Sequence, residues 1–138
     1  MATTTTSAKW IFDKAIYLMD EQNEQTGQTQ TADTKEYELR TVGILNVLRH
    51  EVYPFCECRT QLQPICPEIE TLASVLQVDD EIAQGVLPYG LAGHLLLGEN
   101  DAMANYFLQK YYEVLATIRA GRRGQWEALS CAYGGLDV

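Results

Sequence analysis

Three of the four cysteines in this 138-residue chain lie close together in the sequence, and cysteine thiolates are common zinc ligands. Cys56, Cys58 and Cys66, joined by His50, could supply a Cys3His set. Structural zinc sites usually pair their ligands with about two to four intervening residues, and neither half of this set has that spacing. We therefore expect free thiols in a partly buried connection, with no metal and no other cofactor.

Other groups capable of catalysis are few. The two histidines, His50 and His94, belong to no catalytic motif, and the sequence contains no Gly-rich phosphate loop, nucleophile elbow, His-Glu-x-x-His or EF-hand pattern. We interpret His94 as a core or edge histidine. We interpret Asp79 and Asp80 as a helix start, where carboxylates favour the helix dipole, rather than as metal ligands. The sequence therefore predicts that the protein is not an enzyme.

The net charge of the chain limits the kinds of partner that it can bind. Ten Lys and Arg against nineteen Asp and Glu give a net charge of −9, which argues against tight nucleic-acid binding. The charge is uneven: residues 51–113 hold ten acids and two bases, whereas residues 114–138 hold three arginines and two acids. An acidic body thus carries a slightly basic tail. The tail of one subunit could dock on the body of its neighbour, or both could be ordinary solvated surfaces.

The composition is that of one globular domain, with 46% apolar and 21% charged residues. The longest apolar runs are only a few residues, far short of the ~18 that a membrane span needs. The N-terminus lacks the basic and apolar regions of a secretory signal. We therefore expect no membrane partner, and a protein that stays in a reducing cytoplasm with its cysteines as thiols.

Apolar periodicity predicts four helices. The first covers residues 8–21, capped by Thr6 or Ser7, and the second begins after Asp33 or Thr34 and ends before Pro54. The third covers residues 82–97, and a turn through Gly98 and Asn100 leads to a fourth that ends at Gly121, so that the last two helices are antiparallel.

The third predicted helix is apolar on almost every side, which places it in the middle of the core. Pro88 removes one backbone hydrogen bond and predicts a kink within residues 84–88. Gly85, Gly90 and Gly93 are expected to allow close approach of other helices. The predicted core comprises Ile44, Leu48, Leu87, Leu91, Leu95, Phe107 and Leu115.

These elements predict a mainly α fold: a small bundle of about four helices with a long irregular connection between the second and third. Within that connection, residues 73–78 could form a short strand or one turn of helix. We divide the chain into a helical bundle domain at residues 1–121 and a C-terminal tail at residues 122–138. The tail is Gly-rich and has too few apolar groups to fold alone.

Four stretches carry a resemblance to a known family: FDKAI (12–16), DTKEY with ILNVL (33–37 and 44–48), DEIAQGVLPYGLAGHLLLGEND (80–101) and ANYFLQKYYEVL (104–115). They resemble the head-to-tail adaptor (connector) proteins of long-tailed phages and of prophages of Gram-positive bacteria. The resemblance covers residues 8–118 and is most specific over 85–101. It implies a helical bundle that forms a ring beneath the portal, passes DNA through its bore and receives the tail or a stopper protein. The cysteine loop and the Gly-rich tail depart from the pattern.

The resemblance implies a homo-oligomeric virion protein that is present in the host cytoplasm before assembly. We expect its assembly surface in and next to the tail, loosely ordered until a neighbour covers it, although the tail could instead fold back on its own bundle. The alternative function is a monomeric cytoplasmic interaction module whose acidic surface binds a basic partner. The expected assembly residues are Arg119, Arg122, Arg123, Trp126 and Leu129.

Overall fold

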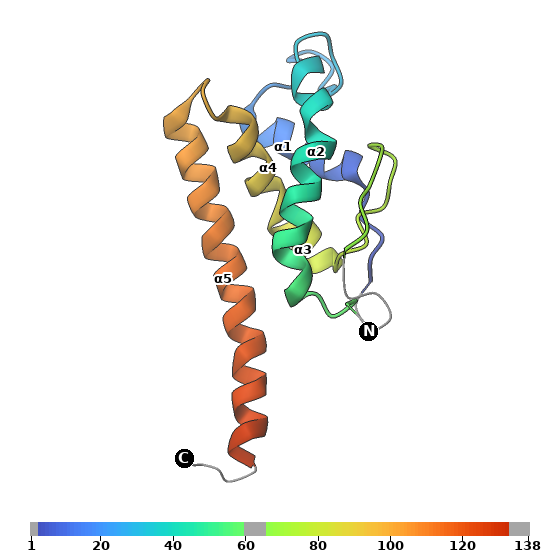
Figure 1. Ribbon diagram of the computed structural model, residues 1–138. Coiled ribbons are helices and arrows are strands. Elements are labelled where there is room, and N and C mark those ends of the chain that lie inside the picture. Colours follow the sequence, from blue (N-terminus) through green and yellow to red (C-terminus); the bar gives the residue numbers. More distant parts are fainter. Residues whose placement is uncertain (1–2, 60–65, 133–138) are drawn as a thin grey trace.

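The computed structural model describes residues 3–59 and 66–132, of which residues 122–132 are described for the backbone alone. Within these ranges the chain forms five α-helices and one short 3-10 helix (Figure 1). No strand occurs in the described ranges, and the prediction of a small, mainly helical bundle is confirmed. The elements are α1 (Ala8–Met19), α2 (Lys35–Val52), η1 (Tyr53–Phe55), α3 (Asp80–Gly85), α4 (Leu87–Leu96) and α5 (Asp101–Ala132).

The central element is α4, which packs against α5, α1, α2 and α3. Its apolar side chains point in several directions, so one surrounding helix could not cover them all. Leu87, Leu91 and Leu95 are fully buried, as predicted for the all-apolar third helix. Of the other predicted core residues, all are buried except Ile44, which is half-buried and packs against the core.

The predicted kink in the third helix is a full break. α3 ends at Gly85 and α4 begins at Leu87, with Val86 between them at φ −120° and ψ −48°. Pro88 has no backbone N–H, so it cannot continue the hydrogen-bond ladder of α3, but it fits the first turn of a new helix. The break lies inside the predicted range of residues 84–88.

Two of the three glycines predicted to allow close approach do so. A Cβ on Gly93 would lie 2.7 Å from the side chain of Leu108, and one on Gly90 would lie 2.8 Å from the ring of Tyr111. These contacts bring α5 onto the backbone of α4. The prediction is wrong for Gly85, which is exposed and would have nothing within 4 Å of an added Cβ.

The helix boundaries follow local capping signals. The Ser7 hydroxyl accepts a hydrogen bond from the Trp10 amide at 3.2 Å and starts α1, which ends at Met19, two residues earlier than predicted. Gly98 has φ +88°, a left-handed conformation that favours glycine, in the turn between α4 and α5. Asn100 accepts from the amide of Met103 at 3.2 Å and caps α5.

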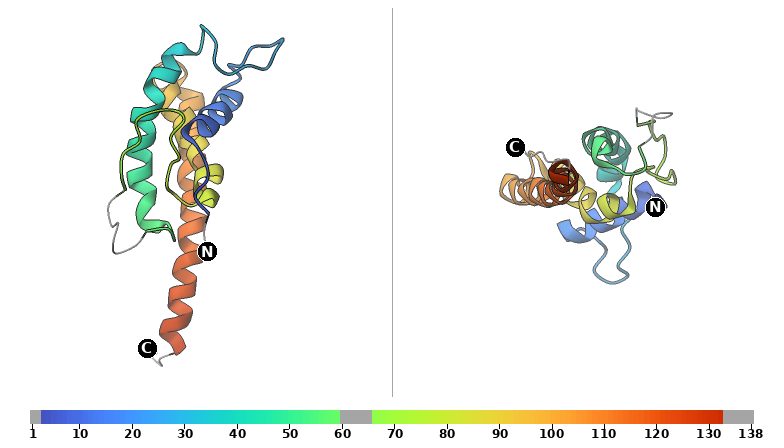
Figure 2. Two further views of the ribbon diagram at one scale, coloured as in Figure 1. Left: turned by 90° about the vertical axis from the view of Figure 1, so that its right-hand side faces the viewer. Right: turned by 90° about the horizontal axis from the view of Figure 1, so that it is seen from below.

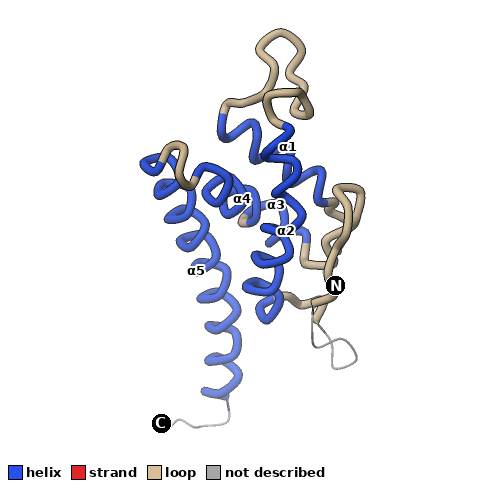
Figure 3. The backbone as a smooth tube through the Cα atoms, turned by 45° about the horizontal axis from the view of Figure 1, so that its top comes forward, coloured by secondary structure: helices blue, strands red, loops and turns tan. Residues whose placement is uncertain are grey.

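Figure 3 shows the irregular connection between α2 and α3 as a loop beside the helices. Two polar side chains hold it on α2. Asn46 binds the backbone of Ile69 with both ends of its amide, at 2.9 and 3.1 Å. Arg49 is fully buried and donates from Nε to the carbonyl of Leu76 at 2.7 Å. Residues 73–78 form neither of the predicted elements: Val75 makes an isolated antiparallel bridge with Ser7.

An N-terminal strap, residues 3–7, runs beside the end of this connection. Its backbone pairs with it through Thr6, whose carbonyl accepts from the Leu76 amide, and through Thr3, whose carbonyl accepts from the Asp80 amide. The Asp80 carboxylate in turn accepts five hydrogen bonds of 2.6–2.9 Å from Thr3, Thr5 and Thr6. The strap and the start of α3 therefore hold each other in place.

The last helix is longer than predicted. α5 does not end at Gly121 but continues to Ala132, and it stands beyond the rest of the bundle (Figures 1 and 2). A glycine inside a helix costs only about 1 kcal/mol, which good helix formers such as Ala120, Arg122 and Arg123 can offset. The division into residues 1–121 and 122–138 remains a prediction, and its boundary falls inside this helix.

Candidate functional site

The predicted assembly surface lies on α5. Because the helix is continuous through Gly121, the five predicted positions, spaced one or three residues apart, fall within one side of the helix. The guanidinium of Arg119 lies over the ring of Phe55 of the same chain, 4.7 Å from its centroid. The side chains of Arg122, Arg123, Trp126 and Leu129 lie outside the described residues.

Among the α5 residues whose side chains the structure describes, the last to pack on the core is Ile118. Leu115 is buried and Ile118 is partly buried against the core, whereas Ala120 and Gly121 are exposed. Figure 1 shows the remaining backbone, to Ala132, projecting away from the other helices. The contact between Arg119 and Phe55 therefore lies where the helix leaves the bundle.

A second exposed surface lies on α2. Leu39 and Val47 are 73% and 62% exposed, and with Gly43 between them they form a stripe at intervals of four residues. A shallow groove beside this stripe is lined by Gly43, Asn46, Val47, His50, Glu51 and Glu68. Exposed apolar side chains therefore lie beside acidic ones on this surface.

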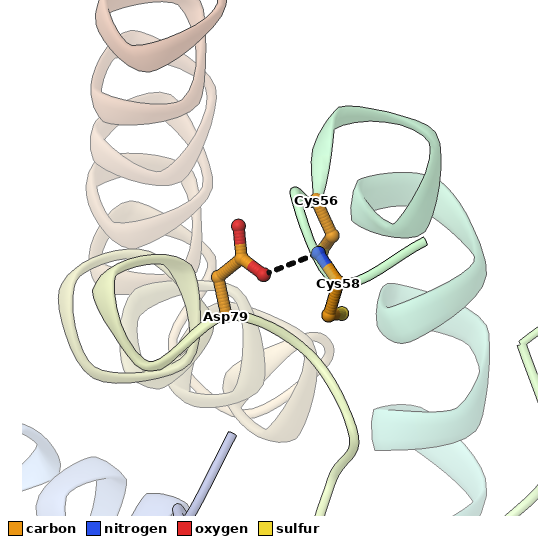
Figure 4. Close-up of side chains that lie close together, drawn as sticks. All are labelled: Cys56, Cys58 and Asp79. Atoms are coloured by element: carbon orange, nitrogen blue, oxygen red, sulfur yellow. Dashed lines mark hydrogen bonds between the residues drawn. The ribbon is translucent and has the colours of Figure 1, made fainter. Parts of the chain in front are cut away.

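The structure also brings together groups that are far apart in the sequence. Cys56 follows η1, Cys58 lies two residues later, and Asp79 directly precedes α3 (Figure 4). One sulfur from each cysteine and one carboxylate oxygen all lie within 4.8 Å of one another. Asp79 is 1% exposed, Cys56 is 7% exposed and Cys58 is half-buried. We call these three residues the Cys–Asp cluster.

Backbone amides fix the carboxylate of the Cys–Asp cluster. The two Asp79 oxygens accept from the amide of Glu57 at 2.7 Å and from the amide of Cys58 at 3.0 Å. The Cys58 thiol donates to the carbonyl of Gln77 at 3.4 Å, and the Cys56 thiol donates to the carbonyl of Val52 at 3.5 Å. These bonds join the end of α2, the irregular connection and the start of α3.

The thiols are poor nucleophiles in this environment. Burial, the neighbouring Cys56 thiol and the Asp79 carboxylate raise the pKa of Cys58 to about 12. Burial also raises the pKa of Cys66, although Arg49 opposes it. Both groups are therefore protonated at neutral pH, because a thiol ionises only near or above its pKa.

The ligand set considered from the sequence does not assemble as such. Cys66 and His50 are not members of the Cys–Asp cluster, and Nδ1 of His50 lies 2.8 Å from the carbonyl of Asn46. No disulfide joins Cys56, Cys58 and Cys66 to one another in the described part of the chain, and the absence of a metal stays a prediction. Sequence reasoning missed Asp79 as a neighbour of the cysteines, because more than twenty residues separate them and local spacing carries no signal of the contact. It did identify Asp79 and Asp80 as the start of a helix, which is confirmed for α3.

Comparisons with known proteins add nothing to this geometry. Neither the family models, nor the curated proteins, nor the solved structures yield a match to this sequence. None of the helices in the described part of the chain is long and apolar enough to cross a membrane.

Proposed function

We propose that this chain is a phage or prophage structural protein, a head-to-tail adaptor whose copies form a ring between the portal and the tail or stopper protein. The proposal starts from the sequence resemblance, which is most specific over residues 85–101. That stretch covers the end of α3, the central helix α4 and the turn into α5. The resemblance therefore concerns the part of the bundle that sets the direction of α5.

The length of α5 is the observation that carries the proposal. Its 32 residues span ~48 Å at about 1.5 Å per residue. The last side chain of α5 described as packing on the core is that of Ile118, and the backbone beyond it projects from the bundle (Figure 1). A projecting helical extension is marginally stable in water unless something packs along it. We infer that a neighbouring molecule packs along the extension in the assembled state.

Charge supports a second copy of this chain as that neighbour. Residues 51–113 carry ten acids and two bases, a net charge of −8, whereas the extension at residues 119–132 carries Arg119, Arg122 and Arg123 against Glu127. Opposite charges on two different surfaces guide the encounter of like subunits. A contact between two different surfaces is heterologous, and it forms a ring when the rotation between neighbouring copies closes.

An acidic protein also suits a passage for DNA. Acidic side chains around a bore repel phosphates, so DNA passes without being held, whereas a basic lining would bind it. In this proposal the portal and the tail or stopper protein are the partners. The protein is in the host cytoplasm before assembly and in the virion afterwards, and it has neither a catalytic role nor a membrane partner.

The alternative is a monomeric cytoplasmic interaction module with an acidic surface. The exposed stripe on α2 favours it, because Leu39 and Val47 lie on the same helix as Glu51 and close to the groove that Glu68 lines. Such a surface fits a basic partner that supplies apolar anchors. In that case the chain would act as a single copy and would have no affinity for a portal.

Binding to the portal separates the two functions. The full chain and a chain lacking residues 122–138 would be sedimented with portal rings from the same genome, and their thermal unfolding would be compared. The adaptor proposal predicts that the full chain co-sediments and that the shortened chain stays folded but does not. Two results would count against it: a full chain that fails to bind, or a shortened chain that unfolds or aggregates by itself, which would mean that the tail belongs to its own bundle.

A further inference from the structure

We propose that the Cys–Asp cluster is a binding site for one thiophilic divalent cation, of which Zn²⁺ is the expected occupant. Cys56, Cys58 and Asp79 supply two sulfurs and one oxygen, a donor set that zinc accepts and that calcium and magnesium do not favour. The inference is independent of the proposed function, because it concerns a single chain. It also revises the expectation from cysteine spacing, which considered His50 and Cys66 and not Asp79.

The donors are close to the geometry that the ion requires. With Zn–S distances of ~2.3 Å, two sulfurs of a tetrahedral site lie ~3.8 Å apart. The three donor atoms already lie within 4.8 Å of one another, so closing the site needs movement of about 1 Å. Rotation of the two cysteine side chains supplies such a movement without a change in the helices. Cys58 is only half-buried, which leaves a fourth position open to water.

Hydrogen bonds orient the Asp79 carboxylate, as they usually do for carboxylates that bind a metal. The amides of Glu57 and Cys58 fix both Asp79 oxygens, and a carboxylate oxygen can accept more than one bond. The two amides belong to the same segment as the cysteines. The backbone therefore sets the position of the carboxylate relative to both sulfurs before any ion arrives.

The charge of the site balances when the ion binds. Counted as one carboxylate and two thiols, the empty cluster carries a net charge of −1. Binding of a divalent cation releases the two thiol protons and gives two thiolates, one carboxylate and the ion, again −1. The buried cluster thus exchanges two protons for one ion without gaining charge, which avoids the cost of an unpaired buried charge.

This exchange makes the affinity depend on pH. Each released proton raises the apparent affinity about tenfold per pH unit, so two protons give up to ~100-fold per unit between about pH 6 and 8. Arg49 interacts electrostatically with the Cys56 thiol, and Tyr53 interacts with both thiols. Burial raises the pKa of Tyr53, and arginine stays charged, so neither group titrates in that range.

Cobalt(II) tests the site directly, because thiolate ligation to Co²⁺ produces an intense near-ultraviolet charge-transfer band. The reduced full chain would be titrated with Co²⁺ without oxygen in a weak buffer that contains a pH indicator. We expect one ion per chain, release of two protons and loss of the band when Zn²⁺ is added. Absence of the band at saturating Co²⁺, or a site that binds without proton release, would overturn the proposal.

Single substitutions test which side chains bind the ion. Cys56→Ser and Cys58→Ser should each weaken Co²⁺ binding by at least ~10-fold and reduce the band, and Asp79→Asn should weaken binding by ~10–100-fold. Cys66→Ser is the matched control, since it removes a buried thiol outside the cluster and should keep the band. Far-ultraviolet circular dichroism would verify that each variant is folded. Equal loss in Cys66→Ser, or full binding by the Cys56→Ser/Cys58→Ser double variant, would contradict the assignment.

Discussion

Replacing Asp80 by asparagine should release the N-terminal strap from α3. The carboxylate accepts five hydrogen bonds from three threonines, two at Oδ2 and three at Oδ1. Asparagine keeps one acceptor oxygen, so the hydroxyls of Thr3 and Thr5 lose their shared acceptor, while the bonds to the other oxygen lose the assistance of a charge. At about 1 kcal/mol for each lost bond, with a smaller loss for the weakened ones, we expect Asp80→Asn to lower the free energy of unfolding by ~2–3 kcal/mol.

The effect should depend on pH in a defined direction. Burial alone would raise the pKa of Asp80, but the hydrogen bonds from Thr6, Thr3 and Thr5 outweigh it and hold the pKa well below the usual range. A carboxyl whose pKa is lower in the folded state stabilises the fold above its unfolded pKa of about 3.9. That contribution disappears as the pH falls towards the folded pKa. The difference between wild type and Asp80→Asn should therefore be full near neutral pH and shrink below about pH 4.

Urea unfolding, followed by circular dichroism at several pH values, measures both the loss of stability in Asp80→Asn and its dependence on pH. Asp33→Asn is the matched control, since it removes the same charge from an exposed position shortly before α2 and should change stability by less than about 0.5 kcal/mol. The reasoning would be refuted if Asp80→Asn changed stability no more than this control. It would also be refuted if the difference persisted unchanged at about pH 2.

Four further substitutions test the packing, each by urea unfolding. Leu91→Ala removes a fully buried side chain from α4 and should cost ~2–5 kcal/mol; a loss below about 0.5 kcal/mol would show that the site is not core. Gly93→Ala should lower the free energy of unfolding by ~1–3 kcal/mol, because the new Cβ meets Leu108. Gly85→Ala has open space around it and should be neutral or stabilising by up to ~1 kcal/mol. Equal effects of the two substitutions would contradict the close packing of α4 and α5. In Arg49→Lys the lysine cannot reproduce the buried hydrogen bonds from Nε and Nη1, so the free energy of unfolding should fall by ~2–4 kcal/mol. A loss as small as that of an ordinary surface substitution would contradict the role of Arg49 in holding the connection.

Local signals predicted the parts of the fold that depend on neighbours in sequence. Ser7 caps α1, Gly98 takes the left-handed turn and α4 is the buried helix, because capping, glycine conformation and apolar periodicity act over a few residues. The continuation of α5 through Gly121 was missed, since a glycine lowers helix stability without forbidding the helix.

Long-range contacts could not be predicted in the same way. Arg49 looks like an ordinary exposed helix residue until the irregular connection lies over it and presents the carbonyl of Leu76. Asp79 meets Cys58 across more than twenty residues, through a connection whose path no periodicity defines. The exposed stripe of Leu39 and Val47 was missed because only the observed packing of α2 decides which side faces solvent.

Native mass spectrometry of the chain bound to its portal tests the central proposal most directly. The adaptor account predicts one discrete complex that contains several copies of the chain. It also predicts that the double variant Arg122→Glu/Arg123→Glu, which reverses the charge of the α5 extension, no longer joins the complex. The control variant Lys14→Glu/Lys35→Glu changes the net charge by the same amount, but on α1 and α2, and should still join it. A chain that joins the portal as a single copy or not at all, or that loses binding equally in both variants, would contradict it.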